Sequence, residues 1–99
     1  MTIADWRTEI DNLDNELLRL LNQRADLAAR IGKLKRAANL PLCDEDRERA
    51  LVARLCDVNA GPFDDQAVVI IFQQIIRETR RVESRAVAPE AESVERVPQ

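Results

Sequence analysis

One apolar repeat occupies the first third of the chain, from residue 3 to residue 34. Its members follow one another at alternating steps of three and four, the spacing of a helix that packs along one face against another helix. They are Ile3, Trp6, Ile10, Leu13, Leu17, Leu20, Leu27, Ile31 and Leu34. No proline interrupts the pattern, which predicts a single long helix over about 5–38 that ends before Pro41.

One position of this repeat carries a charge. Arg24 stands between Leu20 and Leu27, where the spacing calls for a hydrophobic residue. A guanidinium keeps its proton and is almost never fully buried alone, so an arginine that faces a helical core implies a bound anion or a water-filled pocket. We interpret Arg24 as one wall of an anion-binding site. The alternative is an arginine that reaches the rim of the helix interface or pairs there with an acid.

Two shorter helices are predicted after the first. Asp44 is expected to cap a helix over 44–59, which Gly61-Pro62 terminates. Asp64 is expected to cap a third helix over about 65–85. Their predicted buried residues are Leu51, Leu55, Val58, Val68, Ile71, Phe72, Ile75, Ile76 and Val82. The fold class is therefore all-α, with a helical domain over residues 1–86 and a tail over residues 87–99 that is expected to be disordered.

The length of the first helix predicts a second chain. About 34 helical residues make a rod of about 50 Å, whereas a compact chain of this size has a radius of gyration of about 13 Å. Much of the rod must project beyond the chain's own core, with its apolar stripe uncovered. We therefore expect a homodimer.

The composition excludes several kinds of chemistry. The 99 residues contain no histidine, so neither an imidazole base nor a Ser-His-Asp triad can be assembled. Gly32 and Gly61 are the only glycines, which rules out the glycine-rich phosphate loops. Cys43 and Cys56 are too far apart for a CxxC motif and are expected to be reduced thiols, so no metal site is predicted.

The location and the broad class of partner follow from the same composition. No apolar run approaches the roughly 18 residues of a membrane span, and the first residues do not resemble a secretory leader, so we expect a cytoplasmic protein without membrane contact. Basic residues alternate with acids and only three residues are aromatic, which disfavours nucleic acid as a partner. The net charge is −3, yet basic residues dominate the segment from Arg24 to Arg36.

Several polar residues lie on or beside the predicted buried faces. Arg24 and Lys35 share a helix face with their Cα atoms about 16 Å apart, so their side chains can hold the two ends of a small dianion. Arg7 is rotated by roughly 100° from Arg24 and can join such a site only from a second, antiparallel chain. Arg47 lies one turn before Leu51, at the edge of the buried face.

Five segments in this order and spacing resemble the all-helical class of chorismate mutase. The resemblance extends over about residues 4–85. The segments are Trp6-Arg7-Thr8-Glu9-Ile10-Asp11-Asn12-Leu13-Asp14, then Leu17-Leu18 through Asn22-Gln23-Arg24, Ile31-Gly32-Lys33-Leu34-Lys35, Asp44-Glu45-Asp46-Arg47-Glu48-Arg49, and Ile75-Ile76. This resemblance implies an intertwined homodimer that converts chorismate to prephenate by a Claisen rearrangement, with neither a cofactor nor a covalent intermediate.

The resemblance also implies roles for eight residues. Arg24, Arg47 and, from the other subunit, Arg7 correspond to the groups that hold the two substrate carboxylates. Lys35 resembles the lysine that donates to the ether oxygen, and Glu48 with the backbone at Asp44 resembles the holder of the ring hydroxyl. Thr79 stands at the position of a minor carboxylate contact, often a serine. Glu83 occupies the second ether-oxygen position, where an ionised carboxylate cannot donate, so we expect it to act in its protonated form.

Two other functions stay open on the sequence. Isochorismate pyruvate-lyase shares the fold, the arginines and the lysine with this class, but it lacks the Asp-x-x-Arg-Glu opening of the second helix that is found here. A non-catalytic helical dimerisation module would explain the apolar repeat and the length of the first helix. It would not explain why Arg24, Lys35, Arg47 and Glu83 converge.

Overall fold

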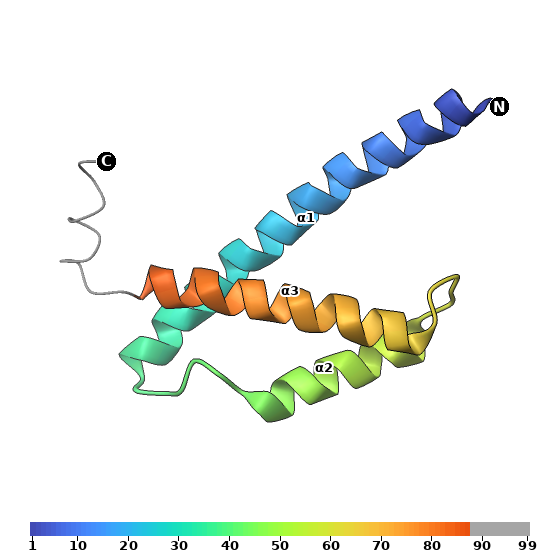
Figure 1. Ribbon diagram of the computed structural model, residues 1–99. Coiled ribbons are helices and arrows are strands. Elements are labelled where there is room, and N and C mark those ends of the chain that lie inside the picture. The colour runs from blue at the N-terminus through green and yellow to red at the C-terminus, as the bar shows by residue number, and fades with distance from the viewer. Residues whose placement is uncertain (88–99) are drawn as a thin grey trace, which may run out of the picture.

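The structure is a computed structural model that describes residues 1–87, and it contains three α-helices (Figure 1). They are α1 (Ile3–Ala37), α2 (Glu45–Val58) and α3 (Asp65–Ala86). The described residues form no β-strand, so the all-α prediction and its three helices are confirmed. The predicted tail lies outside the described residues, except for Val87, which caps α3.

A side-chain cap starts each helix. Thr2 and Asp5 form a reciprocal capping box, in which Thr2 Oγ1 accepts from the Asp5 backbone N–H at 3.1 Å and Asp5 Oδ2 accepts from the Thr2 backbone N–H at 2.8 Å. This box explains why α1 begins at Ile3, two residues before the predicted start at about residue 5. Asp44 and Asp64 cap α2 and α3 as expected, each accepting a backbone N–H from the first turn of its helix.

A left-handed residue ends α1. Asn39 has a φ of 58°, a conformation that asparagine tolerates better than most residues. The Leu40 N–H then donates back to the Lys35 carbonyl at 2.8 Å, and the Asn39 N–H donates to the Arg36 carbonyl at 3.1 Å. The helix stops before Pro41 as predicted, but this turn rather than the proline accounts for the stop.

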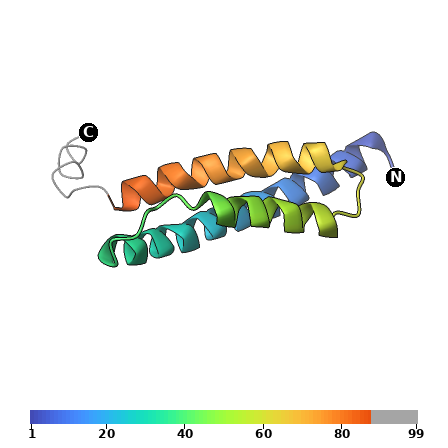
Figure 2. The ribbon, with the colours of Figure 1, turned by 90° about the horizontal axis from the view of Figure 1, so that it is seen from below.

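The helix α3 packs against both other helices, and α1 and α2 do not pack directly against each other within residues 1–87. Figure 2 shows α3 running alongside both of its neighbours. The buried core is small: Leu51 of α2 and Val68 and Ile76 of α3 are each less than a tenth exposed. Gly32 is the one buried residue of α1, at the point where this helix meets α3.

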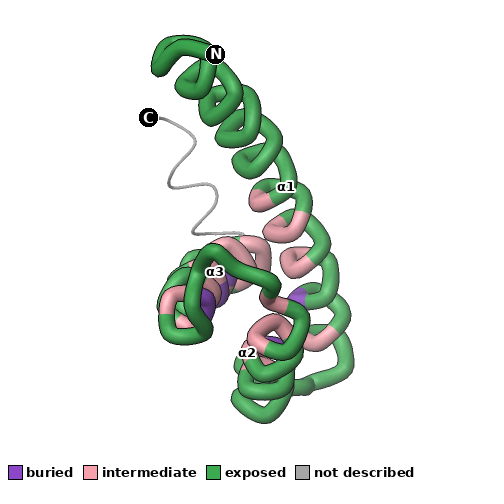
Figure 3. The backbone as a smooth tube through the Cα atoms, turned by 90° about the vertical axis from the view of Figure 1, so that its right-hand side faces the viewer, coloured by how far each residue is buried: buried purple, intermediate pink, exposed green. Residues whose placement is uncertain are grey.

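The N-terminal half of α1 leaves the α2 and α3 pair, and its backbone is exposed throughout in Figure 3. Every apolar member of the α1 repeat is between 48% and 71% exposed. The radius of gyration is 17.3 Å, well above the value of about 13 Å for a compact chain of this size. The prediction that much of the first helix projects beyond the chain's own core is therefore confirmed.

Two residues predicted to be buried are exposed in the single chain. Val58 is 66% exposed because it ends α2, and Ile71 is 38% exposed because the covered stripe of α3 is narrower than its apolar stripe. Leu55, Phe72, Ile75 and Val82 are half-buried. These positions depart from the prediction because periodicity identifies an apolar face but not how much of it a neighbouring helix covers.

The cysteines are free thiols, with Cys43 exposed and Cys56 half-buried on α2. Partial burial, reinforced by the nearby carboxylates of Asp65 and Asp57, raises the pKa of Cys56 above its ordinary value. Across residues 1–87, no helix combines the length and apolar character that crossing a membrane requires.

Candidate active site

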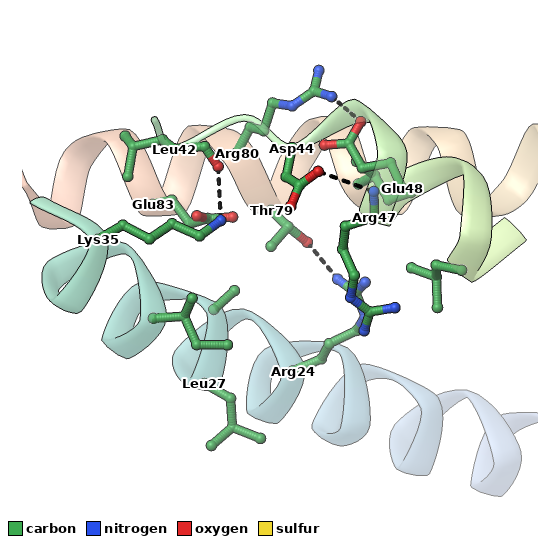
Figure 4. Close-up of a pocket in the computed structure, with 14 residues that line it drawn as sticks. Arg24, Leu27, Lys35, Leu42, Asp44, Arg47, Glu48, Thr79, Arg80 and Glu83 are labelled. Carbon is green, nitrogen blue, oxygen red and sulfur yellow. Dashed lines mark hydrogen bonds and ion pairs between the residues drawn. The ribbon is translucent and has the colours of Figure 1, made fainter. Parts of the chain in front are cut away.

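A cavity of about 430 Å³ lies between α1 and α2, with α3 along its third side (Figure 4). Its apolar wall includes Leu27, Ile31, Leu42, Leu51 and Ile76. Its polar wall consists of Arg24, Lys35, Asp44, Arg47, Glu48, Thr79, Arg80 and Glu83. Seven of the eight site residues named from the sequence are therefore brought together, and Arg80 is an addition.

Arg24 is tied to α3 by a hydrogen-bonded threonine. Its Nη1 donates to Thr79 Oγ1 at 3.1 Å, and the Thr79 hydroxyl in turn donates to the Ile75 carbonyl at 2.7 Å. Thr79 is buried at 8% exposure, so this orientation is fixed. One of the five guanidinium N–H groups of Arg24 is used in this way, and the others remain able to bind an anion.

Lys35 is held by the loop that follows its own helix. Its Nζ donates to the Leu42 carbonyl at 3.0 Å, which leaves two of the three ammonium protons free. The left-handed turn after α1 brings Leu42 back over the last turn of the helix. No residue pattern in the sequence indicates this contact, because it uses a backbone carbonyl.

The start of α2 supplies the next part of the wall. Asp44 Oδ1 accepts from the Arg47 backbone N–H at 3.0 Å as the helix cap, so this carboxylate serves the helix N-terminus while also lining the cavity. The same bond orients the first turn, from which the Arg47 side chain enters the cavity (Figure 4).

Glu48 and Arg80 form an ion pair between α2 and α3, and both residues line the cavity. The hydrogen bond and charge of Glu48 raise the pKa of Arg80 above its ordinary value. Arg80 was missed from the sequence. It stands four residues after Ile76 and three before Glu83, so the same periodicity that identified Thr79 and Glu83 could have found it.

Gly32 of α1 faces the side chain of Glu83 on α3. A Cβ built at Gly32 would stand 3.5 Å from Glu83 Cβ and 3.6 Å from Glu83 Oε2. A methyl group at Gly32 would therefore make ordinary van der Waals contact with the Glu83 side chain, which lies beside the α1 backbone. Figure 4 shows the Lys35 amine and the Glu83 carboxylate at the same end of the cavity.

Three cations of the cavity have no acidic partner among the residues that the structure describes. Within residues 1–87, neither Arg24, Lys35 nor Arg47 has a carboxylate oxygen within 4.0 Å, whereas Arg80 is paired with Glu48. Like charges gathered in a partly enclosed space repel one another. A bound anion would relieve this repulsion, so the three unpaired charges favour a negatively charged ligand in this cavity.

Arg7 does not reach this cavity. It lies seventeen residues before Arg24 on the same helix, which corresponds to about 26 Å along the axis. No group of three or more His, Cys, Asp or Glu side chains within residues 1–87 is arranged to hold a metal ion.

A family model described as chorismate mutase type II matches residues 6–84. The chain belongs to this family. It is 44% identical over 78 residues to a bifunctional chorismate mutase/prephenate dehydratase of Aquifex aeolicus, an alignment that covers 75% of this chain and 22% of that protein. It is 27% identical over 86 residues to a chorismate mutase of Methanocaldococcus jannaschii, covering 84% of this chain and 85% of that protein. The chain thus spans about a fifth of the bifunctional relatives and most of the shorter one.

Solved structures of the family share the fold. A chorismate mutase of Thermus thermophilus (form II) superposes with a TM-score of 0.83 at 36% identity, covering 84% of this chain and 94% of that one. A chorismate mutase of Helicobacter pylori, solved in complex with prephenate, superposes with a TM-score of 0.80 at 26% identity, covering 86% and 92%. The three-helix architecture is therefore that of the family.

The contact between Gly32 and Glu83 generates a prediction about stability. Gly32→Ala adds a methyl at ordinary contact distance and is expected to leave the free energy of unfolding unchanged or raise it by up to about 1 kcal/mol. Gly32→Leu overfills the same space and should lower the free energy by about 1–3 kcal/mol. Chemical denaturation of each variant measures both values.

The control is Ala37→Leu, at an exposed position in the last turn of the same helix. It is expected to change the free energy of unfolding by less than about 0.5 kcal/mol. A Gly32→Leu variant as stable as this control would contradict the close packing of α1 on Glu83.

Proposed function

We propose that this chain converts chorismate to prephenate as a chorismate mutase, without a cofactor. The observation that carries the proposal is the cavity lined by Arg24, Lys35 and Arg47, cations with no acidic partner within residues 1–87, in a chain of the chorismate mutase type II family. Chorismate carries two carboxylates, and its rearrangement breaks one C–O bond as one C–C bond forms within the same molecule. Such a reaction needs positioning and charge stabilisation rather than a nucleophile.

Arg24 and Arg47 bind the carboxylates of the substrate. Arg24 and Arg47 each present a planar fork of N–H donors, which matches the two oxygens of a carboxylate. Together with Arg7 from a second copy, they hold the two carboxylates close enough to keep the flexible side chain of the substrate folded over its ring. Holding this chair-like conformer supplies much of the rate acceleration, because the free substrate seldom adopts it.

Lys35 and Glu83 act on the ether oxygen. This oxygen gains negative charge as its bond to the ring breaks, so donors aimed at it stabilise the transition state more than the ground state. The ammonium of Lys35 has two protons free for this purpose. Glu83 supplies a second donor when its carboxyl group is protonated.

The remaining residues orient the substrate ring and the arginines. Glu48 accepts a hydrogen bond from the ring hydroxyl, and the backbone at Asp44 contributes a second contact. Thr79 supports carboxylate binding, because its hydroxyl fixes Arg24 at 3.1 Å.

A second copy of the chain completes the site in this proposal. The exposed apolar stripe of α1 is continuous, and an identical stripe on a second copy would cover it around a two-fold axis. Two α1 helices packed antiparallel would bring the N-terminal half of one beside the cavity of the other. Arg7, about 26 Å from Arg24 on its own helix, would then enter the partner's cavity. The assembly is an intertwined homodimer.

The identity of the product tests the proposed reaction. Purified protein is mixed with chorismate, the loss of chorismate is followed, and the product is identified by chromatography and mass spectrometry. Prephenate supports the proposal. Isochorismate is offered in a parallel assay, and formation of pyruvate from it would instead support the lyase. If neither substrate reacts, the result would favour a non-catalytic helical interaction module.

Arg24→Met tests the role of the central cation. We expect kcat/KM to fall by about a hundredfold or more, because a donor is lost where charge is held in the transition state. The free energy of unfolding should change by less than about 1 kcal/mol, since the Thr79 hydroxyl keeps its bond to the Ile75 carbonyl. Arg30→Met is the matched control, because Arg30 is exposed on the same helix and does not line the cavity. Equal activity of the two variants would contradict the proposal.

Complementation tests whether Arg7 acts across the dimer. Arg7→Ala and Arg24→Ala are each expected to lose most activity, but a heterodimer of the two holds one site with both arginines intact. Co-expression should therefore restore about a quarter of the wild-type activity, because half of the dimers are mixed and each has one working site. Sedimentation of the same samples reports the oligomeric state. A mixture as inactive as its parents would show that Arg7 does not act in trans.

The pH profile tests Glu83 as a donor. A protonated carboxyl donates and an ionised one does not, so kcat/KM should fall as pH rises. Glu83→Gln donates at every pH and should flatten this fall while keeping activity. A flat wild-type profile would contradict the role given to Glu83.

A further inference from the structure

An ion pair between Arg80 of α3 and Glu48 of α2 borders the cavity. Arg80 Nη2 on α3 donates to Glu48 Oε1 on α2, and both side chains line the cavity. Glu48 is the less exposed partner, with its side chain 25% accessible against 42% for Arg80. The pair therefore joins two helices beside the cavity rather than lying on the outer surface.

The packing of Arg80 limits where its guanidinium can go. Its Nε is buried and makes no hydrogen bond among the described residues, while Nη2 reaches Glu48. The inner part of the guanidinium is thus enclosed by protein, while Nη2 at its outer end pairs with Glu48. This anchors the cation more firmly than an exposed surface arginine, whose ion pair contributes little.

Glu48 has other cations within the same cavity. Arg47 is its neighbour in sequence, and Arg24 and Lys35 line the same space, with no acidic partner in the described part of the chain. A glutamate free to rotate would be drawn toward them and would neutralise a charge that the ligand needs. The contact with Arg80 holds the carboxylate at the α3 side instead. It also occupies Oε1 and leaves Oε2 without a hydrogen bond within residues 1–87.

We propose that Arg80 is a positioning residue, which fixes the carboxylate of Glu48 through Oε1 so that Oε2 accepts the hydroxyl of the bound ring. The inference rests on the proposed function, since it assigns Arg80 the task of orienting a group that contacts the substrate. Arg80 keeps Glu48 away from Arg24, Lys35 and Arg47 and thereby keeps those three cations available to the carboxylates.

Arg80→Met removes the charge and the donors while keeping the length of the side chain. We expect kcat/KM to fall by about tenfold, because a hydrogen bond to a charged group is lost. The loss should appear more in KM than in kcat, since the ring hydroxyl does not itself react and its hydrogen bond is made in both the ground state and the transition state. Arg80→Lys keeps the charge and should recover most of this loss. Arg81→Met is the matched control: Arg81 is the next residue of α3, pairs with Glu78 on the surface and does not line the cavity.

A double-substitution cycle with Glu48→Gln separates positioning from a general effect on folding. If Arg80 acts through Glu48, adding Arg80→Met to Glu48→Gln should change kcat/KM by less than about twofold. The melting temperature of each variant is measured as well, and it should differ little between Arg80→Met and Arg81→Met. A tenfold loss that persists in the Glu48→Gln background would overturn the proposal, as would Arg80→Met with wild-type KM and kcat.

Binding of prephenate, measured by calorimetry, gives a second readout that does not require turnover. Weaker binding by Arg80→Met than by Arg81→Met, absent in the Glu48→Gln background, supports the positioning role even if the wild type does not convert chorismate. A wild type that binds without turnover overturns the proposed function alone. If the wild type neither binds prephenate nor converts chorismate, the proposed function and the role of Arg80 are both overturned. If the wild type is active and Arg80→Met is unaffected, only the role of Arg80 is overturned.

Discussion

Repulsion among Arg24, Lys35 and Arg47 is the constraint that the rest of the structure must satisfy. Three positive charges line one cavity between α1 and α2 without acidic partners in residues 1–87, so each must be restrained by something that does not cancel its charge. Arg24 is restrained by the Thr79 hydroxyl and Lys35 by the Leu42 carbonyl, while the backbone of Arg47 is held by the helix cap. Neutral acceptors hold the Arg24 and Lys35 cations, the Asp44 cap holds only the backbone of Arg47, and all three charges stay available to a ligand.

The acidic residues of the cavity are arranged by the same constraint. Asp44 accepts from the N-terminus of α2, Glu48 is paired with Arg80, and Glu83 packs against the backbone at Gly32. Asp44 and Glu48 are thereby committed to groups other than the three unpaired cations, and Glu83 forms an ion pair with none of them within residues 1–87. A cavity with nearly balanced formal charge can in this way present a locally positive surface, because the positions of the charges matter more than their sum. On the proposed function, this is how a chain with a net charge of −3 would bind a doubly negative substrate.

The parts of the fold that depend on apolar periodicity could be predicted from the sequence. Contacts that depend on the path of the backbone could not. The three helices and the charged position at Arg24 follow from apolar spacing, and the caps at Asp44 and Asp64 follow from residue type. The Leu42 carbonyl could not be found, since any residue supplies a carbonyl and only the turn at Asn39 aims this one. Arg80 could have been found from its spacing to Ile76 and Glu83. The exposure of Val58 and Ile71 depends on how helices cover one another, which one chain's pattern does not specify.

The exposed stripe of α1 and the absence of Arg7 from the cavity are two consequences of one geometry. A straight helix carries Arg7 about 26 Å from Arg24 and at the same time carries nine apolar residues away from the chain's own core. No change in the length of α1 could bring Arg7 to the cavity of its own chain, because a helix does not fold back on itself. In the proposed assembly an antiparallel second copy would solve both, since it would cover the stripe and bring its own N-terminal half to the cavity. On this proposal the hydrophobic contact that assembles the protein also sets the distance between substrate-binding charges, so assembly and catalysis depend on the same helix.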